Sequence, residues 1–278
     1  MKYEEITKEQ LGIGSPIDLE IVPDEDSIYD HMAKDMFKRI TANNAAGKKT
    51  VFIVPVGPVG QYRRLAALCN ENRVSLKNVW FFNMDEYLDE NDQPIPVTHP
   101  LSFEGFMYRE FYDLMDEELN IPLAQRVFPK PGHEDELWPL IQSLGGVDTS
   151  YGGIGINGHI AFNEPTEDGI PMDNETFKNQ TSRILSLTRE TRTINSVTAA
   201  NGYIDYIPKR CITIGMKEIL SAKHIRFYMN RTWQKGIVRK ILHGPVTYKV
   251  PASFFQEHPD AKLIIADYVA EPPVGQLR

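Results

Sequence analysis

Short apolar segments that alternate with segments of helical periodicity are the feature that most constrains the fold of this chain. Residues 50–55, TVFIVP, are too few for a helix and rich in β-branched side chains, which is typical of a strand buried on both faces. The same character predicts strands at residues 78–83, 211–215, 225–229 and 263–266, and residues 151–155, YGGIG, are typical of a strand end that opens into a glycine-rich loop. Helical spacing predicts helices at residues 61–72, 103–115, 217–222 and 233–242, and another over residues 28–40 that Ser27 caps. We therefore expect right-handed βαβ units and a modified Rossmann-like α/β fold, with a mainly parallel sheet flanked by helices.

Composition narrows the class of protein. The 278 residues contain no internal repeat and no low-complexity linker, so we expect residues 1–278 to form one domain. No run of about 18 apolar residues occurs, and the N-terminal MKYEEITKEQLG lacks the basic and apolar regions of a secretory signal. We therefore expect a cytoplasmic protein with no membrane partner, in which Cys69 and Cys211 are buried, reduced thiols.

The charge balance bears on the possible partners. A net charge of −8 at pH 7 argues against nucleic acid as the main partner. It does not exclude a small anionic substrate, because a site can be locally positive on an acidic protein. A small molecule is therefore the partner that we expect.

Three segments of unusual composition each follow a predicted strand. The turn 56–60, VGPVG, follows the first strand, Asp85 follows the second, and the glycine-rich loop 153–159 follows the third. Ligands of open parallel sheets bind beyond the carboxyl ends of the strands. We therefore expect these three segments to meet in one crevice that forms the functional site.

Two short motifs contain the ionisable residues that could act in catalysis. Residues 153–165, GIGINGHIAFNEP, place His159 and Glu164 behind glycines that permit close approach of a ligand. Residues 83–87, NMDEY, place Asp85 and Glu86 at a strand end. Taken alone, the first motif also fits a structural turn in which the histidine is hydrogen-bonded and has no catalytic role. The second also fits the solvent-exposed first turn of a helix.

Together the two motifs resemble the glucosamine-6-phosphate deaminase family, whose members carry NMDEY after one strand and a glycine-rich segment ending in NEP after a later one. The resemblance extends from about residue 30 to residue 267. It includes HP at residues 99–100 with Ser102, SLTRETR at residues 186–192, IGMKEIL at residues 214–220 and PASFFQEHP at residues 251–259.

The resemblance implies an enzyme that opens a 2-amino sugar phosphate, isomerises the aldose to a ketose and releases ammonia, without a metal or an organic cofactor. Asp85 then matches the base that moves a proton between C2 and C1, and apolar surroundings would raise its basicity. His159 matches the acid–base group of ring opening, a role that suits a side chain titrating near neutrality. Glu164 matches the glutamate that hydrogen-bonds and polarises this histidine.

The resemblance also implies a set of substrate-binding residues. Gly57, Val59 and Gly158 match positions that approach the substrate, and Lys235 matches a lysine that contacts the phosphate. Glu86 is expected beside the substrate as a structural neighbour rather than as a catalyst. Family members associate as homo-oligomers, so we expect the same of this chain.

The catalytic loop departs from the family pattern at one position. Asn157 stands where many members carry an aspartate. An amide oxygen still accepts a hydrogen bond from the imidazole, but it brings no negative charge. The substitution should therefore lower the basicity of His159.

The phosphate-binding equipment departs more strongly. Val56 and Val59 lack hydroxyl groups, Pro58 lacks a backbone N–H, and Val197 stands in place of an arginine. We therefore expect weak phosphate binding, glucosamine 6-phosphate to be a poor substrate, and a different amino sugar or sugar derivative to be the natural one. Compensating cations are available at Arg63, Arg64 and Arg231. Residues 166–181, longer than the usual connection, are expected to form a different lid.

Two other functions stay open at this point. A 6-phosphogluconolactonase shares the fold and a related histidine loop, but it has no need of a proton-shuttling aspartate. A non-enzymatic sugar-sensing module also uses this fold, but the sequence has no obvious helix-turn-helix extension. Fold alone does not decide among them, because function depends on the site.

Overall fold

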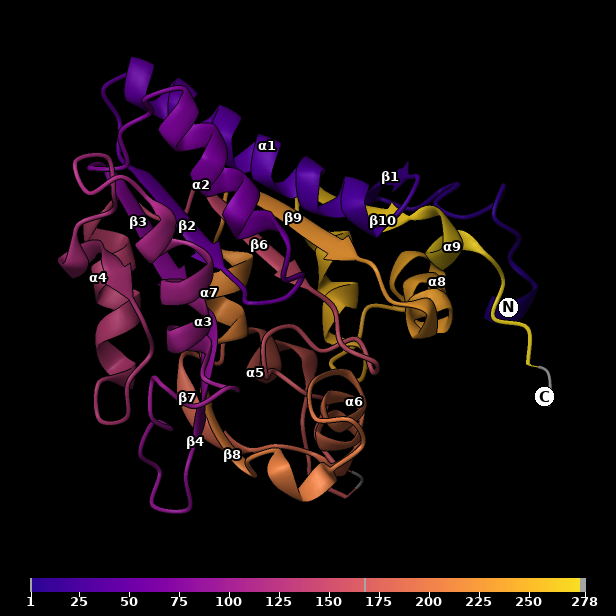
Figure 1. Cartoon of the computed structure of the whole chain (residues 1–278). Coiled ribbons are helices and arrows are strands. Elements are labelled where there is room, and N and C mark those ends of the chain that lie inside the picture. Colours follow the sequence, from indigo (N-terminus) through magenta and orange to yellow (C-terminus); the bar gives the residue numbers. More distant parts are fainter. Residues whose placement is uncertain (1, 168, 276–278) are drawn as a thin grey trace.

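The computed structural model describes residues 2–167 and 169–275, and a seven-stranded parallel sheet forms the centre of this part of the chain (Figure 1). The strands follow the order β1-β10-β9-β6-β2-β3-β5, and every neighbouring pair is parallel. Their bounds are β1 (Asp18–Val22), β2 (Thr50–Val54), β3 (Val79–Asn83), β5 (Arg126–Val127), β6 (Thr149–Gly153), β9 (His224–Met229) and β10 (Ala261–Ala266). All five residues of β2 are buried, as the apolar pattern requires. The predicted mainly parallel α/β fold is therefore confirmed.

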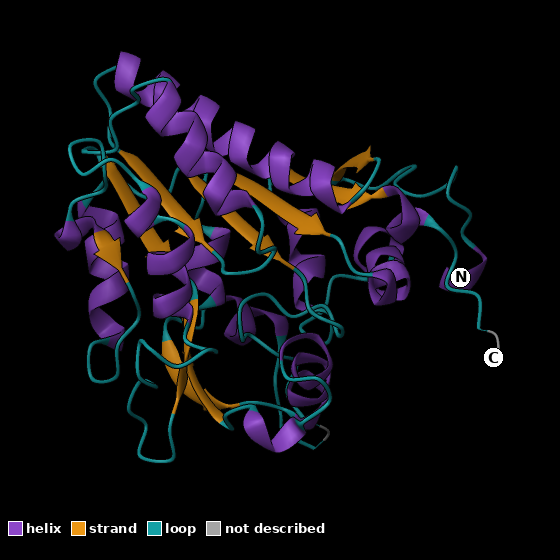
Figure 2. Cartoon of the chain, in the orientation of Figure 1, coloured by secondary structure: helices purple, strands orange, loops and turns teal. Residues whose placement is uncertain are grey.

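Helices cover both faces of this sheet (Figure 2). The long helix α1 (Glu25–Ala45) packs beside α2 (Gln61–Glu71) on one face, and α4 (Leu137–Ser143) and α7 (Met216–Leu220) lie on the other. The remaining α-helices are α3 (Phe103–Glu110), α5 (Asn174–Lys178), α6 (Arg189–Ala199), α8 (Lys235–His243) and α9 (Asp267–Ala270). Short 3-10 helices occur at Tyr3–Glu5, Tyr112–Leu114, Leu123–Gln125, Glu134–Glu136, Ile204–Tyr206, Thr232–Gln234 and Pro251–Glu257.

Two helix boundaries differ from the prediction. Helix α1 is capped by Asp24, whose carboxylate accepts a hydrogen bond from the backbone N–H of Ser27 at 2.8 Å, so Ser27 lies inside the helix instead of capping it. Helix α3 ends at Glu110, and a separate 3-10 turn completes the segment that was predicted as one helix.

A second, smaller sheet was not predicted. Strands β4 (Asp85–Leu88), β7 (Arg183–Ser186) and β8 (Arg210–Thr213) pair antiparallel in the order β4-β8-β7. The predicted strand at residues 211–215 therefore belongs to this sheet and not to the parallel one. Figure 1 shows the small sheet below the large one, with α6 beside it. Asp85 is the first residue of β4, so it lies at the junction of the two sheets.

Both cysteines are buried and unpaired, as predicted. Cys69 belongs to the apolar core around the large sheet, and Cys211 belongs to a separate cluster beside the small sheet. Within the described residues, no helix combines the length and the apolar character needed to cross a bilayer.

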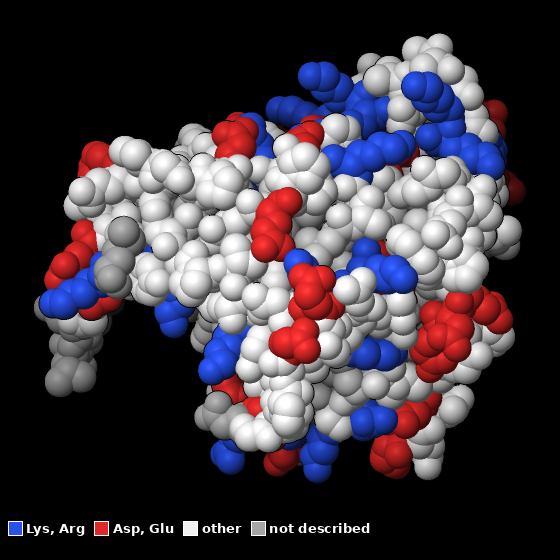
Figure 3. Space-filling model, turned by 180° about the vertical axis from the view of Figure 1, so that it is seen from behind, with Lys and Arg blue, Asp and Glu red and all other residues white. Residues whose placement is uncertain are grey.

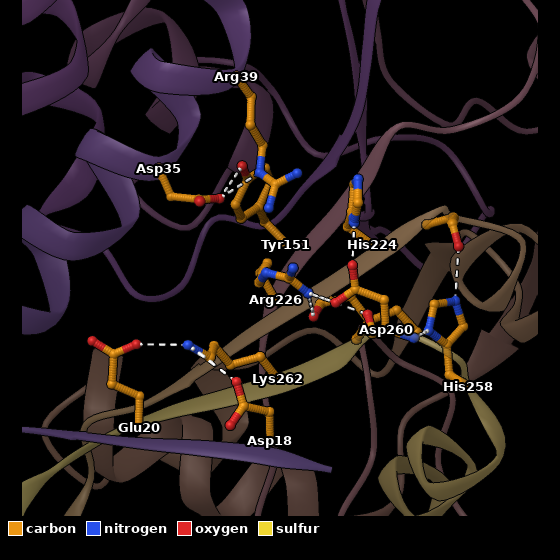
Figure 4. A network of polar contacts seen from close by, with 12 residues as sticks. Asp18, Glu20, Asp35, Arg39, Tyr151, His224, Arg226, His258, Asp260 and Lys262 are labelled. Atoms are coloured by element: carbon orange, nitrogen blue, oxygen red, sulfur yellow. Dashed lines mark hydrogen bonds and ion pairs between the residues drawn. The ribbon is translucent and has the colours of Figure 1, made fainter. Parts of the chain in front are cut away.

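Charged side chains of both signs are interspersed on the face seen from behind, with a group of basic ones at the upper right (Figure 3). Figure 4 shows a network of polar contacts at the large sheet, which includes side chains of β1, β9 and β10. Asp260, just before β10, accepts hydrogen bonds from Arg226 and His224 of β9, and its Oδ1 lies 2.7 Å from Arg226 Nη1. The Arg226 guanidinium, with His224, lowers the pKa of the Asp260 carboxyl to about 2. This pairing ties the chain before β10 to the neighbouring strand.

The Asp260 pairing predicts a stability effect with a defined sign. We expect Asp260→Asn to lower the free energy of unfolding at pH 7 by about 1 kcal/mol, a value reduced for the partial exposure of the carboxylate. Because the folded-state pKa lies below the ordinary value of 3.8, the stabilisation is present above about pH 4 and is lost as the pH falls toward about 2.

Urea unfolding of the wild type and the variant from pH 7 down to pH 3 measures this difference. Asp113→Asn, at an exposed carboxylate, is the matched control and should change the stability little at any pH. A difference between wild type and Asp260→Asn that grows as the pH falls from 4 to 3 would contradict this role of the Asp260 carboxylate.

Candidate functional site

A cavity of about 220 Å³ opens where β2, β3, β6 and β9 end. The turn after β2, Asp85 after β3 and the glycine-rich loop after β6 all line it, so the predicted convergence of three strand ends is confirmed. A fourth wall, after β9, was not predicted. The lining residues are Pro55, Val56, Gly57, Pro58, Met84, Asp85, Phe103, Gly153, Ile154, Gly155, His159, Ala161, Phe162, Asn195, Tyr228, Asn230, Arg231, Trp233 and Gln234.

Asp85 lines the cavity with a carboxylate that has little access to solvent. The residue is 8% exposed, and no hydrogen bond to its carboxylate is present among the described residues. Burial raises the pKa of Asp85 well above its ordinary value, and repulsion from Glu86 adds to the rise. The arrangement produces a carboxylate of raised basicity that is open to a ligand.

Glu86 points away from the cavity, because successive residues of a strand face opposite sides. Its carboxylate accepts hydrogen bonds from the Ser102 hydroxyl at 3.0 Å and from the backbone N–H groups of Phe103 at 3.0 Å and Glu104 at 2.9 Å. The carboxylate therefore accepts hydrogen bonds from the N–H groups that the first turn of α3 leaves without partners inside the helix. Glu86 acts as a structural neighbour, and it is absent from the cavity lining.

His159 is held in the loop by contacts that leave one ring nitrogen free. Gly155 lies directly against the ring, since a Cβ built on it would come within 2.0 Å of His159 Cε1. The His159 Nδ1 atom lies 2.7 Å from Asn157 Oδ1. An amide oxygen only accepts, so Nδ1 carries the hydrogen and Nε2 presents its lone pair. The expected contact between Asn157 and the imidazole is therefore confirmed.

The electrostatic environment of His159 favours the neutral ring. Burial lowers the pKa of the imidazole below its ordinary value, and the charge of Glu164 opposes this effect. Asn157 supplies no charge to shift the balance. The neutral imidazole is the form that can accept a proton.

Glu164 reaches His159 through another residue. Its carboxylate accepts the Thr188 backbone N–H at 2.8 Å and the hydroxyl groups of Thr188 and Thr191. Thr191 Oγ1 lies 3.4 Å from His159 Nδ1. The direct hydrogen bond implied by the resemblance is therefore not formed among the described residues, because the first turn of α6 occupies the carboxylate instead.

Known proteins share both the sequence and the fold. The chain is 32% identical over 255 residues to a glucosamine-6-phosphate deaminase of Porphyromonas gingivalis, covering 90% of this chain and 91% of that one. A glucosamine-6-phosphate deaminase of Parabacteroides distasonis is 32% identical over 234 residues, covering 82% and 80%. The chain belongs to the glucosamine-6-phosphate deaminase family.

Solved structures agree with this membership. A monomeric glucosamine-6-phosphate deaminase matches with a TM-score of 0.75 and 26% identity, covering 91% of this chain and 99% of that one. A 6-phosphogluconolactonase of Thermotoga maritima matches with a TM-score of 0.65 and 13% identity, covering 90% and 100%, which reflects a shared fold. No protein-family model matches the chain.

The substrate-binding residues predicted for this deaminase are only partly at the cavity. Gly57 lines it, whereas Val59, Gly158 and Lys235 do not belong to its lining. Val59 turns outward and is 42% exposed. Gly158 adopts a φ of +87° and packs against Val250, so it shapes the loop without facing the cavity. Lys235 is the first residue of α8, directly after the lining residues Trp233 and Gln234.

Among the proposed compensating cations, only Arg231 lines the deaminase cavity. Arg63 pairs with Glu110, and Arg64 pairs with acidic side chains of α1. Val197 is 64% exposed and does not belong to the lining. Arg231 was one of three candidates in the sequence analysis, and no sequence pattern distinguished it from Arg63 and Arg64.

The expectation of a lid over residues 166–181 is wrong for the part that the structure describes. None of these residues lines the cavity, and residue 168 lies outside the described residues. Asn174 instead joins the segment to the chain after α8, by hydrogen bonds to Val246 O at 3.2 Å and from Tyr248 N at 2.9 Å.

Within the described residues, no group of three or more His, Cys, Asp or Glu side chains is placed to hold a metal ion.

The contact between Asn157 and His159 predicts how the imidazole titrates. Asn157→Asp places a negative charge where Oδ1 now lies 2.7 Å from Nδ1. A close opposite charge favours the imidazolium, so we expect the pKa of His159 to rise by about 1 to 3 pH units. Titration of the imidazole by NMR measures the change. Asn179→Asp, at an exposed position, is the matched control, and an unaltered His159 titration in Asn157→Asp would refute the contact.

Proposed function

We propose that the protein converts a 2-amino aldose into a ketose with release of ammonia. The observation that carries this proposal is the presence of a buried carboxylate of raised pKa, Asp85, and a neutral imidazole with a free nitrogen, His159, in one cavity. Membership of the deaminase family supports the same reaction. Phe103 and Phe162 add apolar surface suited to the carbon face of a sugar.

The first step of the proposed reaction opens the sugar ring. His159 Nε2 takes the proton of the anomeric hydroxyl, the bond between C1 and the ring oxygen breaks, and the same nitrogen returns the proton to that oxygen. A neutral imidazole suits this exchange because it accepts and then donates a proton near neutral pH. Glu164 positions Thr191 beside Nδ1 and so acts through that residue.

The second step moves a proton between two carbons. Asp85 removes the proton from C2 and delivers it to C1, while a proton of the amino group passes to the C1 oxygen, which leaves an imine at C2 and a hydroxyl group at C1. Water then adds to C2 and ammonia departs, so the products are the ketose and ammonia. The raised pKa of Asp85 strengthens it as a base for the carbon-bound proton.

The buried state of Asp85 also bears on the alternatives. Burial of an ionisable group without partners costs free energy, so a residue of this kind marks a site that uses it. Hydrolysis of a lactone requires no carboxylate to carry a proton between C2 and C1. Asp85 therefore supports the isomerisation rather than a lactonase or a sensing role.

The domain organisation, the cellular environment and the oligomeric state of the protein rest on separate observations. Residues of both sheets line one cavity, which supports a single domain for residues 2–167 and 169–275. The predicted domain spans residues 1–278, of which residues 1, 168 and 276–278 lie outside the described part. Two unpaired cysteines support a reducing, cytoplasmic environment. The predicted homo-oligomer stays a prediction, and the solved deaminase of similar fold is monomeric.

Ammonia release from a panel of amino sugars tests the proposal. We expect release from at least one 2-amino aldose, and a kcat/KM for glucosamine 6-phosphate below about 10⁴ M⁻¹s⁻¹, an ordinary enzyme value. The turn 56–60 lacks hydroxyl groups, Lys235 does not line the cavity, and Val197 replaces the family's arginine. A phosphate dianion therefore has few hydrogen-bonding partners there.

Two outcomes would count against these expectations. No ammonia from any amino sugar would contradict the proposed reaction. A value above about 10⁴ M⁻¹s⁻¹ for glucosamine 6-phosphate would show that the expected loss of phosphate affinity is wrong.

A further inference from the structure

The connection between β9 and α8 forms one wall of the cavity and carries a permanent positive charge. Asn230, Arg231, Trp233 and Gln234 belong to this wall. The Gln234 amide donates to Ile154 O at 2.7 Å, which fixes the wall against the glycine-rich loop. Among the described residues that line the cavity, Arg231 is the only lysine or arginine.

Arg231 is positioned by Glu25, the first residue of α1. Arg231 Nη1 lies 3.5 Å from Glu25 Oε1, and the two side chains are 39% and 42% exposed. The same oxygen accepts the Tyr29 hydroxyl at 2.6 Å and the Asn230 amide at 2.8 Å, which fixes the carboxylate. A single long contact between exposed groups contributes little stability. The pairing therefore orients the guanidinium without occupying its five N–H donors.

Other arginines of the chain are bound more completely. Arg210 contacts a carboxylate through two nitrogen atoms, at 2.7 and 2.9 Å. Arg239 is fully buried and donates to three backbone carbonyl groups. Arg231 differs in facing a cavity with one loose partner among the described residues, which is the state of a side chain available to a ligand.

The order of the strands places Arg231 and Asp85 at opposite ends of the cavity. Asp85 follows β3 and Arg231 follows β9, and β2 and β6 lie between these strands. Three strand spacings correspond to roughly 14 Å. The side chains of Asp85 and Arg231 cover part of this span. The remainder suits an open sugar chain with C1 and C2 at Asp85 and its far end at Arg231.

We propose that Arg231 is the specificity-determining residue of this deaminase and binds a terminal carboxylate of an amino sugar acid. The inference rests on the proposed function and names the substrate class for the same site. One planar guanidinium matches the two oxygens of a carboxylate. A phosphate dianion presents three oxygens and two charges. The facing turn lines the cavity with Val56, Gly57 and Pro58, which offer no hydroxyl group and only two backbone N–H groups.

The kinetic test compares three substrates with the same ring and different ends. These are a 2-amino-2-deoxyhexose, its 6-phosphate, and the 2-amino-2-deoxyhexuronate in which C6 is a carboxylate. We expect Arg231→Gln to lower kcat/KM for the uronate by about 100-fold, mainly through KM, because two hydrogen bonds to a charged group are lost. The value for the neutral sugar should stay within about threefold of the wild type.

Two variants serve as comparisons. Arg63→Gln makes the same substitution at an arginine that pairs with Glu110 outside the cavity, and it should leave the kinetics of all three substrates unchanged. Lys235→Met tests the position implied by family resemblance. A loss specific to anionic substrates in Lys235→Met, but not in Arg231→Gln, would overturn the assignment.

Other results also decide the proposal. An equal loss on the neutral sugar in Arg231→Gln would overturn a role in anion recognition. Faster turnover of the 6-phosphate than of the uronate by the wild type would overturn the carboxylate preference. A KM for the uronate that rises with ionic strength in the wild type but not in Arg231→Gln would support it, because salt screens the pairing.

A binding measurement separates this inference from the reaction itself. Trp233 lines the cavity beside Arg231, so its fluorescence can report a bound ligand without turnover. Glucuronate, glucose 6-phosphate and glucose are the probes. We expect glucuronate to bind the wild type with at least about tenfold higher affinity than glucose, and this preference to disappear in Arg231→Gln. A preference retained in the variant would contradict the role of Arg231 even if no amino sugar is turned over.

Discussion

The burial of the Asp85 carboxylate at the junction of the two sheets is the constraint on which the rest of the site depends. Asp85 leaves the parallel sheet after β3 and begins β4, so its direction is set by the pairing of β4 with β8. The neighbouring Glu86 accepts hydrogen bonds from backbone N–H groups in the first turn of α3, which anchors the opposite face of β4. The small sheet therefore contributes to the site, because it holds the buried Asp85 carboxylate, which is costly to ionise, against the cavity where a ligand would bind.

The imidazole is supported in a comparable way from the other side of the cavity. A contact within the loop, from Asn157, fixes which nitrogen of His159 carries the hydrogen. Thr191 then connects the ring to Glu164 and to the start of α6. The two reactive groups thus depend on different elements, so their relative placement is a property of the whole fold and not of one motif.

The parallel sheet and the crevice could be predicted because their signals are local. The apolar run of β2 is buried over its full length, and Asp85 and His159 follow strands that meet at one edge. The small sheet escaped prediction because β4 reads DEYL, which resembles a helix start more than a buried strand. The role of Thr191 could not be foreseen, since 27 positions separate it from Glu164 and only the fold joins them. The same reason hid the position of Arg231, which depends on the strand order β9-β6-β2-β3.

Solvent-deuterium incorporation by Asp85→Asn is the measurement that follows the proton Asp85 is proposed to carry. In heavy water the wild type should place deuterium at C1 of the ketose. We expect Asp85→Asn to fold normally but to incorporate deuterium and turn over substrate at least about 100-fold more slowly, since general base catalysis contributes factors of this size. Incorporation by Asp85→Asn at the wild-type rate would contradict the assignment of Asp85 as the base.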